Sequence, residues 1–508
     1  VGGAMAEVFG HFLDAAQARE CGDEEAARAG FWAAVKQAGK IAGKGGGDTL
    51  IAEGIRSAEA DVPVRLAASL ALNALGELTE DAADEVSLPA AKRKAQLAKA
   101  EGMFSEALRL WETNALALVS LGHLRRSRGD HSGAVKLYLR AAELPSVRRP
   151  RATWVEDFVS EDRERCVPIA AYSLAHLLTR MQRHKDALPV LQRFGVKYRI
   201  APPVWAAVKR PPRKAVRKPA DLDLPCVLAG VVPETLRKTI LHAFRPGAPY
   251  WGETNYDTRE YFSFFYDVKK SPSNAIEELV QDHLIPNLPV DRKIVAAEWW
   301  VHARDRSSDM GHQLHFDMEE RTLEAEGRVL NPAVSAVVYL AAAGAGPTLV
   351  LDQNINNGFA NQGWLGYPSD GGCLFFPGDR LHGVVPSTPS PGYRVVLLVA
   401  LWDRDDFAPG RRRKGLGPQA DIPKKAEWVR ELPLVKPGKT KPTNLPGHVV
   451  PVSPVWEKIP ATRGPKMDLP CEMDQRYFVH HAKDFKRIVM KEHCGVEEPK
   501  PKRRKVES

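Results

Sequence analysis

Two short segments of the chain carry side chains of the kind that bind transition metals. The first, GHQLHFD at 311–317, contains His315 and Asp317, and the second, FFPGDRLHGV at 375–384, contains His382. Two imidazoles and one carboxylate are the ligand set that holds a ferrous iron while leaving other positions open. Residues i and i+2 of a β-strand project to the same side, so His315 and Asp317 on one strand can contact one metal ion. We expect His382 to supply the third ligand.

The His-x-Asp pair by itself is weak evidence, because the chain has 15 His and about one such pair arises by chance. His184-Lys185-Asp186 is such a pair, in a region of helical periodicity where i and i+2 point in different directions. The signal strengthens with Arg394, which opens the apolar run 393–402. A buried Arg beside a metal requires an anionic ligand, and a carboxylate pairs with a guanidinium through two hydrogen bonds.

On these motifs, region 222–406 resembles the iron(II)- and 2-oxoglutarate-dependent dioxygenases, nearest to the prolyl-4-hydroxylase-like branch. The resemblance implies a double-stranded β-helix (jelly roll) with His315, Asp317 and His382 as iron ligands and Arg394 binding the distal carboxylate of 2-oxoglutarate. It also implies hydroxylation of a C–H bond with dioxygen, with ascorbate as a candidate reductant. Prolyl hydroxylases usually have Lys near the position of Arg394, so the resemblance does not imply that proline is the substrate.

Three further residues are weaker candidates for contacts with the co-substrate. Tyr339, His302 and Trp300 lie on predicted strands that flank the metal ligands, where a hydroxyl or an imidazole can donate a hydrogen bond. Ordinary packing inside a barrel explains the same residues, and both interpretations stay open.

The elements that must position these residues are short strands and two helices. Apolar, β-rich runs broken by Gly, Pro and Asp are typical of an antiparallel sandwich or barrel. Helices are expected at 233–244 and 273–284, on the outside of the barrel. The predicted strands are 294–304, 333–341, 347–352, 373–376 and 393–402.

The region 1–200 is rich in Ala and Leu with helical periodicity and is predicted to be all-helical. Within it, large and small residues recur at the offsets of tetratricopeptide (TPR) repeats, with Ala at 107, 134 and 187 in equivalent places. These alanines are unevenly spaced, so we expect an irregular, TPR-like helical domain. A generic helical bundle is the alternative.

Two stretches are basic and rich in Pro. Residues 201–221 are predicted to be an interdomain linker, and 407–508 a largely irregular tail. Residues 404–508 hold 24 Lys and Arg against 14 Asp and Glu, while the whole chain carries a net charge of +9. The run 501–506 (PKRRKV) resembles a signal for a nuclear import receptor, which predicts a nuclear protein, or a cytoplasmic one if the run is only a solvated terminus. Contact of the tail with nucleic acid is a weaker expectation.

Composition narrows the class of protein. At 508 residues the chain is long enough for two to four domains, and 44% hydrophobic with 27% charged residues is ordinary for a soluble globular protein. No apolar run approaches the length of about 18 residues that spans a bilayer, so no membrane contact is expected. The six Cys form no CxxC pair, which favours neither a zinc finger nor a disulfide framework.

Four functions remain in competition. The favoured one is a protein hydroxylase whose helical repeats select a polypeptide. The others are an oxygenase acting on nucleic acid, an oxygenase acting on a small molecule, and a non-enzymatic scaffold. The expected architecture is multidomain: an α-helical repeat domain, a jelly roll and a basic tail.

Overall fold

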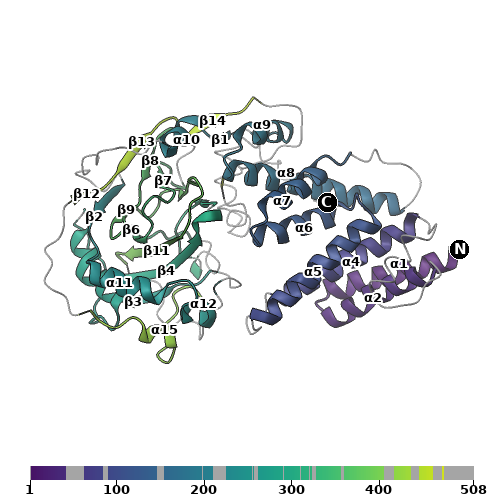
Figure 1. Cartoon of the computed structure of the whole chain (residues 1–508), viewed down its shortest axis with the longest axis horizontal. Helices are drawn as coiled ribbons and strands as arrows, with labels where there is room; N and C mark the ends of the chain where they lie inside the picture. The colour runs from purple at the N-terminus through teal and green to yellow at the C-terminus, as the bar shows by residue number, and fades with distance from the viewer. Residues whose placement is uncertain are drawn as a thin grey trace, which may run out of the picture. The chain divides into compact units, whose positions relative to one another are not determined.

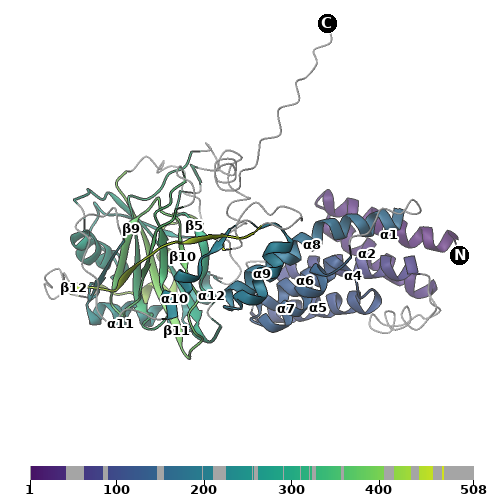
Figure 2. The ribbon, with the colours of Figure 1, turned by 90° about the horizontal axis from the view of Figure 1, so that it is seen from above.

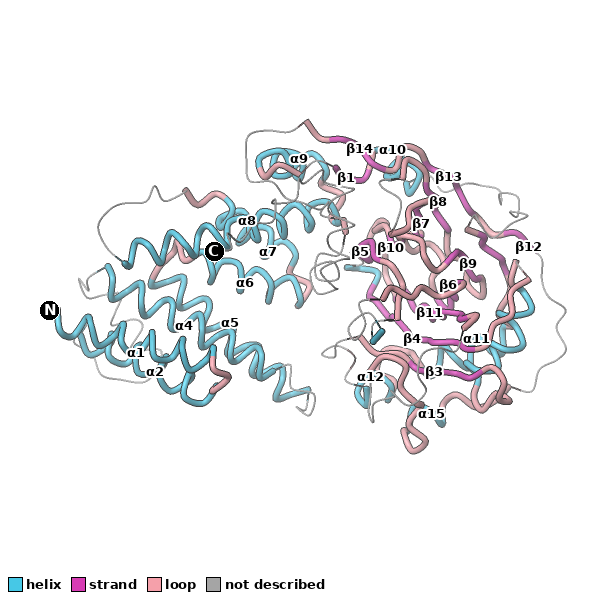
Figure 3. Tube along the Cα trace, turned by 180° about the vertical axis from the view of Figure 1, so that it is seen from behind, coloured by secondary structure: helices cyan, strands magenta, loops and turns pink. Residues whose placement is uncertain are grey.

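The computed structural model describes residues 2–473 except for 42–61, 84–89, 146–153, 197, 210–224, 255, 257–260, 290, 309, 320, 323–327, 356–359, 405–416, 436–444 and 461–471. The chain forms two compact units, one of residues 1–178 and 184–194 and the other of residues 179–183 and 195–508. The first is helical and the second is rich in strands, as Figures 1 and 3 show.

The first unit consists of helices that pair with their sequence neighbours. The pairs α1 with α2, α4 with α5, and α6 with α7 are in contact along their lengths (Figure 1). The helices are α1 (Gly2–Glu20), α2 (Glu24–Ile41), α4 (Val62–Ala83), α5 (Ala90–Leu110), α6 (Ala115–Ser127), α7 (His131–Ala142), α8 (Trp154–Arg180) and α9 (His184–Arg193).

The α6–α7 pair shows why the sequence folds locally in this way. Asn114 and Asp130 cap the two helices, each accepting a hydrogen bond from a backbone N–H of the first turn. Gly122 on α6 leaves room for the ring of Tyr138 on α7, because a Cβ at position 122 would lie 2.6 Å from a ring carbon. A small residue facing an aromatic one therefore sets the close approach of the two helices. The expected helical character of this region is confirmed, whereas its TPR-like repeat stays a prediction.

The second unit is built on two antiparallel sheets. The seven-stranded sheet has the order β12-β2-β9-β6-β11-β4-β3, and the five-stranded sheet has the order β13-β8-β7-β10-β5. A separate pair joins β1 (Tyr198–Ile200) to β14 (Trp456–Lys458). The strands of the sheets are β2 (Cys226–Ala229), β3 (Phe264–Asp267), β4 (Ala296–Asp305), β5 (His312–His315), β6 (Val334–Ala341), β7 (Thr348–Leu351), β8 (Gly363–Gly366), β9 (Cys373–Pro377), β10 (His382–Val384), β11 (Tyr393–Trp402), β12 (Leu445–Pro446) and β13 (Val449–Val452).

The two sheets pack face to face over a shared apolar layer. Tyr339, Phe376 and Val396 of the seven-stranded sheet cluster there with Val350 and Trp364 of the five-stranded sheet. Because alternate residues of a strand face opposite sides, each strand of the larger sheet presents one set of side chains to this interior and the other to the outside. The five predicted strands correspond to β4, β6, β7, β9 and β11.

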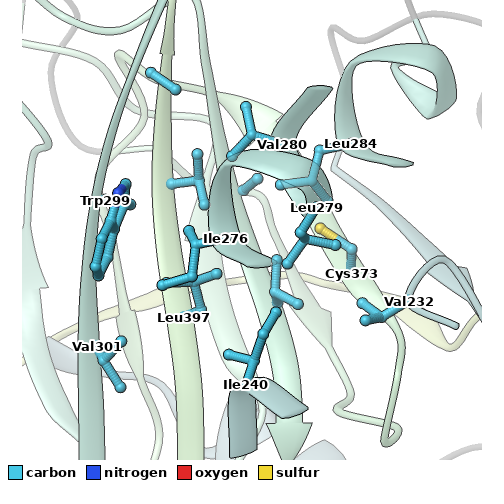
Figure 4. Close-up of a cluster of buried hydrophobic side chains, with 14 of the residues drawn as sticks. Val232, Ile240, Ile276, Leu279, Val280, Leu284, Trp299, Val301, Cys373 and Leu397 are labelled. Atoms are coloured by element: carbon cyan, nitrogen blue, oxygen red, sulfur yellow. The ribbon is translucent and has the colours of Figure 1, made fainter. Parts of the chain in front are cut away.

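Helices cover the outer face of the seven-stranded sheet. Figure 4 shows Ile240 and Ile276 packing there with Trp299 and Leu397 of the strands. In Figure 2, α11 lies beside this sheet, against β6. The two expected helices are found as α11 (Glu234–Ala243) and as α13 (Ala275–Glu278), which continues into a π-helical turn over Leu279–Leu284. Shorter helices are α12 (Pro249–Thr254) and α15 (Glu427–Arg430).

The predicted linker at 201–221 is partly wrong. Residues Pro202–Lys209 form α10, and its Val204 and Trp205 are buried against the five-stranded sheet. Two prolines do not prevent this helix, because Pro in the first turn removes N–H groups that have no partner inside the helix. The rest of the predicted linker, 210–221, lies outside the described residues.

The boundary at 406 and the irregular tail are also corrected. Strand β13 joins the edge of the five-stranded sheet by pairing with β8, and β12 extends the other sheet. Trp428 of α15 is buried in the outer core. The second unit therefore uses chain well beyond residue 406. The run 501–506 lies outside the described residues.

No helix in the described part of the chain is long and apolar enough to cross a membrane. Within the same residues, no disulfide involves Cys21, Cys166, Cys226 or Cys373.

Candidate metal centre

Strands β5 and β10 bring the three predicted ligands together. They pair antiparallel with His382 directly opposite His315, so side chains 67 residues apart in sequence become neighbours. Asp317 follows the end of β5 and is not within the strand as expected, yet its carboxylate still reaches both rings. Its Oδ1 lies 3.8 Å from Nε2 of His315 and 3.6 Å from Nε2 of His382.

Among the described residues, these three make up the one group of His, Cys, Asp or Glu whose ligand atoms lie within 4.8 Å of one another. The sequence pair His184 and Asp186 is on α9 and does not take part. The triad therefore has the side-chain types and the spacing that one metal ion requires.

Hydrogen bonds fix which atoms of the triad face inward. The Nδ1 atoms of His315 and His382 donate to the carbonyl oxygens of Gln313 at 2.9 Å and of Arg380 at 3.0 Å, so each Nε2 carries the lone pair. Ser335 donates from Oγ to Oδ2 of Asp317 at 2.6 Å and leaves Oδ1 toward the imidazoles. Such outer contacts are the usual way in which proteins orient metal ligands.

Burial of His382 provides a test of whether these residues fit a metal ion. The residue is 3% exposed, and its Nε2 is buried with no hydrogen-bond partner among the described residues. Desolvation lowers the pKa of His382 to about 4, although the charge of Asp317 acts in the opposite direction. A neutral imidazole with a buried, unused lone pair fits a metal ligand, as does the mixed nitrogen and oxygen donor set.

Arg394 lies on the interior face of β11. The next residue, Val395, points to the opposite, outer face of the strand. Arg394 is 4% exposed and pairs directly with Arg304 on β4. Two guanidinium groups on adjacent strands make this end of the interior strongly positive. Arg304 is engaged with the backbone of Gly311 and with Nδ1 of His312 at 3.0 Å.

The weaker candidates Tyr339 and His302 lie within electrostatic reach of Arg394. Burial raises the pKa of Tyr339 to about 12, and the positive charge of Arg394 partly offsets this. Its hydroxyl lies 3.5 Å from Oγ1 of Thr348. Burial lowers the pKa of His302 well below its usual value, and both Arg304 and Arg394 lower it further. The Nδ1 of His302 is hydrogen-bonded to the hydroxyl of Tyr256.

A cavity of about 280 Å³ opens beside the triad. His315 and Asp317 lie on one part of its wall, and Glu298, Trp300 and Trp402 form another. The complete lining is Tyr261, Glu298, Trp300, His302, His312, His315, Phe316, Asp317, Met318, Pro332, Ala400 and Trp402.

Sequence reasoning missed two residues of this region. Glu298 lies within the apolar run that predicts β4, and Ser335 lies within the one that predicts β6, so neither was singled out. In each case a sequence signal was available, namely a polar residue in a strand that is otherwise apolar. Such a buried polar residue requires a hydrogen-bonding partner. His312 lies on β5, and the centroid of its ring is 4.7 Å from that of His315.

Comparison with known proteins gives a limited result. No family model matches the chain, and no curated protein sequence matches it. Among solved structures, HygX from Streptomyces hygroscopicus with nickel and 2-oxoglutarate bound is 15% identical at a TM-score of 0.23, covering 35% of this chain and 82% of HygX. A Pseudomonas putida prolyl-4-hydroxylase is 15% identical at a TM-score of 0.24, covering 38% of this chain and 100% of its own.

Prolyl 4-hydroxylase from Phytophthora capsici is also 15% identical, at a TM-score of 0.22, covering 40% of this chain and 72% of its own. The HygX structure contains bound 2-oxoglutarate, and the other two neighbours are prolyl 4-hydroxylases. At such identities and TM-scores the likeness carries no functional argument.

Proposed function

We propose that the second unit is an iron(II)- and 2-oxoglutarate-dependent oxygenase on a double-stranded β-helix. One observation carries the proposal: two Nε2 atoms and one carboxylate oxygen converge between the sheets, each fixed by a hydrogen bond on its far side. Iron bound by these ligands, together with 2-oxoglutarate and dioxygen, supplies oxidation of a C–H bond with succinate and carbon dioxide as the other products.

The protein's own groups prepare this chemistry. Arg394 offers a buried guanidinium to the distal carboxylate of 2-oxoglutarate, and the adjacent positive charge of Arg304 adds to the attraction. Tyr339 stays protonated because of its raised pKa, so its hydroxyl is available as a hydrogen-bond donor. The aromatic walls of the cavity limit access of water to the reacting carbon.

The helical unit is proposed to select a polypeptide substrate. Helical hairpins stacked in series offer an extended surface suited to peptides or helices, and a small-molecule oxygenase leaves this unit without a role. A non-enzymatic scaffold is disfavoured, because burying His382 and Arg394 in one interior, beside the partly buried His315 and Asp317, is costly unless ligands meet them.

Succinate formation tests the oxygenase proposal. Purified full-length protein with iron(II), ascorbate and 2-oxoglutarate is expected to form succinate, and Asp317→Ala is expected to abolish it. Asp305→Ala is the matched control, because Asp305 is an exposed residue at the end of β4 and its loss leaves the triad intact. Equal succinate from wild type and Asp317→Ala would contradict the proposal.

A deletion separates a protein substrate from a small one. Removing residues 1–145 takes away α1 to α7 and keeps β1 and α10, which belong to the second unit. A protein hydroxylase is expected to keep basal succinate formation and to lose oxidation of its polypeptide substrate in a cell extract. Unchanged oxidation of that substrate would assign selection to the second unit alone.

A further inference from the structure

The cavity beside the triad has opposite charges at its two ends. At one end His302 lies under the influence of Arg304 and Arg394. At the other end the wall includes the carboxyl group of Glu298, and the charge that acts on its pKa is a second carboxylate, Glu319. Since β4 rises by about 3.3 Å per residue, His302 and Glu298 are roughly 13 Å apart along the strand.

Glu298 is aimed into this interior by the register of β4. Its neighbour Trp299 points the other way, into the helix-covered outer core that Figure 4 shows. Directly across from Glu298 on β11 stands Ala400, whose small side chain leaves space above the carboxylate. Trp300 and Trp402 flank that space, and the ring of Tyr261 meets Trp300 edge to face at 5.5 Å.

Among the described residues, the partners of Glu298 are neutral groups. Oε1 accepts hydrogen bonds from the hydroxyls of Ser263 and Tyr261, the latter at 3.2 Å. Within the described part of the chain, Oε2 accepts only from the side-chain amide of Gln419, at 3.5 Å. No Lys or Arg within the described ranges forms an ion pair with it, although the side chain is 4% exposed. A buried carboxylate without a cation costs several kcal/mol, so this wall has the chemistry of a site completed by a ligand.

Aromatic faces around a carboxylate are the arrangement that binds organic cations, because the ring quadrupole and the negative charge attract the same group. The volume of about 280 Å³ fits one inserted side chain rather than a large ligand. We propose that the cavity binds the cationic end of a lysine-type side chain of the substrate, with Glu298 as the ion-pair partner and Trp300 and Trp402 as walls. This inference rests on the proposed function for its meaning, because it names the substrate class of the same site.

Burial raises the pKa of Glu298 to about 7, which agrees with a group that becomes fully charged when a cation arrives. The polarity of the cavity also orients the ligands. The positive end attracts an anionic co-substrate, and the Glu298 end attracts the substrate's cation. The cation is therefore a recognition group away from the reacting carbon.

Matched probes test the cation. Nα-acetyl-lysine methylamide, its Nε-trimethyl derivative and the uncharged Nα-acetyl-norleucine methylamide are titrated into full-length protein without added metal, with binding followed by ligand-observed NMR. Both cationic probes are expected to bind about tenfold more tightly than norleucine, a difference of about 1.4 kcal/mol. Equal affinities for the lysine and norleucine probes would overturn the proposal.

Variants locate the binding. Glu298→Gln keeps the shape and removes the charge, so it is expected to bring the three probes within about twofold of one another. Glu278→Gln is the control, since Glu278 is also buried in this unit but accepts a hydrogen bond from the backbone N–H of Val435, and neither residue lines the cavity. Ala400→Leu fills the space across from Glu298 and is expected to exclude all three probes. Selectivity that survives Glu298→Gln would refute the site.

The two proposals fail separately. Succinate formation without preference for the cationic probes leaves the oxygenase standing and removes the cation site. Preference for the cationic probes in a protein that forms no succinate keeps the cation site and removes the oxygenase.

Discussion

The buried carboxylate of Glu298 makes the stability of the second unit depend on pH. Its pKa is raised from 4.5 to about 7 by burial, so the folded state holds this proton more tightly than the unfolded state does. The contribution to the free energy of unfolding is therefore fully present below pH 4.5 and is lost as the pH rises toward 7. A shift of two to three pKa units corresponds to about 3 kcal/mol.

The Glu298→Gln variant removes this contribution, because glutamine does not titrate. We expect the variant to gain stability relative to wild type as pH rises, by about 3 kcal/mol between pH 4.5 and 8. Other carboxylates titrate in the same range, but they are common to both proteins and cancel in the difference. Tyr261 and Glu319 are the titratable groups that act on Glu298 directly, and both remain.

Urea unfolding at several pH values, without metal or ligand, measures this difference. Tryptophan fluorescence is a suitable probe because eight of the 11 tryptophans lie between residues 205 and 456. A difference between variant and wild type that is flat from pH 4.5 to 8 would refute the reasoning that desolvation dominates at Glu298. A difference of opposite sign would mean that a cation already pairs with it.

Three further predictions concern other contacts. Ser335→Ala removes the 2.6 Å hydrogen bond to Asp317 and is expected to weaken metal binding by about 10-fold, measured by calorimetry, with no change in Ser105→Ala, which loses a similar bond in the helical unit. Arg394→Lys keeps the charge but not the two-pronged geometry, so KM for 2-oxoglutarate is expected to rise about 10-fold or more, and an unchanged KM would place the co-substrate elsewhere. Gly122→Ala forces a Cβ to 2.6 Å from the Tyr138 ring and is expected to lower stability by about 1–3 kcal/mol in thermal unfolding, whereas Gly102→Ala on α5 meets nothing within 4 Å and is expected to raise it.

The sequence predicted the strands and the metal ligands best where residue types and their spacing along the chain agree. Apolar runs of strand length located five strands of the second unit, and ligand types with their spacing singled out His315, Asp317 and His382. That β5 pairs with β10, which brings two of them side by side, is a tertiary fact that no local pattern contains.

The remaining differences have physical causes. Helix α10 and strands β12 and β13 contain Pro, which predicts irregular structure when only the local sequence is considered. Pro451 is tolerated in β13 because, among the described strands, β13 is at the edge of its sheet and pairs on one side only. Glu298 was missed because apolar neighbours dominate its strand, although a carboxylate buried there needs a reason to exist.

The number of iron ions bound per chain shows whether His315, Asp317 and His382 form a metal site. Anaerobic titration of full-length protein with iron(II) in the presence of 2-oxoglutarate is followed by calorimetry, for wild type, His382→Ala and His242→Ala. His242 lies on α11, outside the triad. We expect one iron per chain in wild type and in His242→Ala, and loss of that binding in His382→Ala. Iron binding that persists in His382→Ala, or that is absent from wild type, would show that the triad is not an iron site.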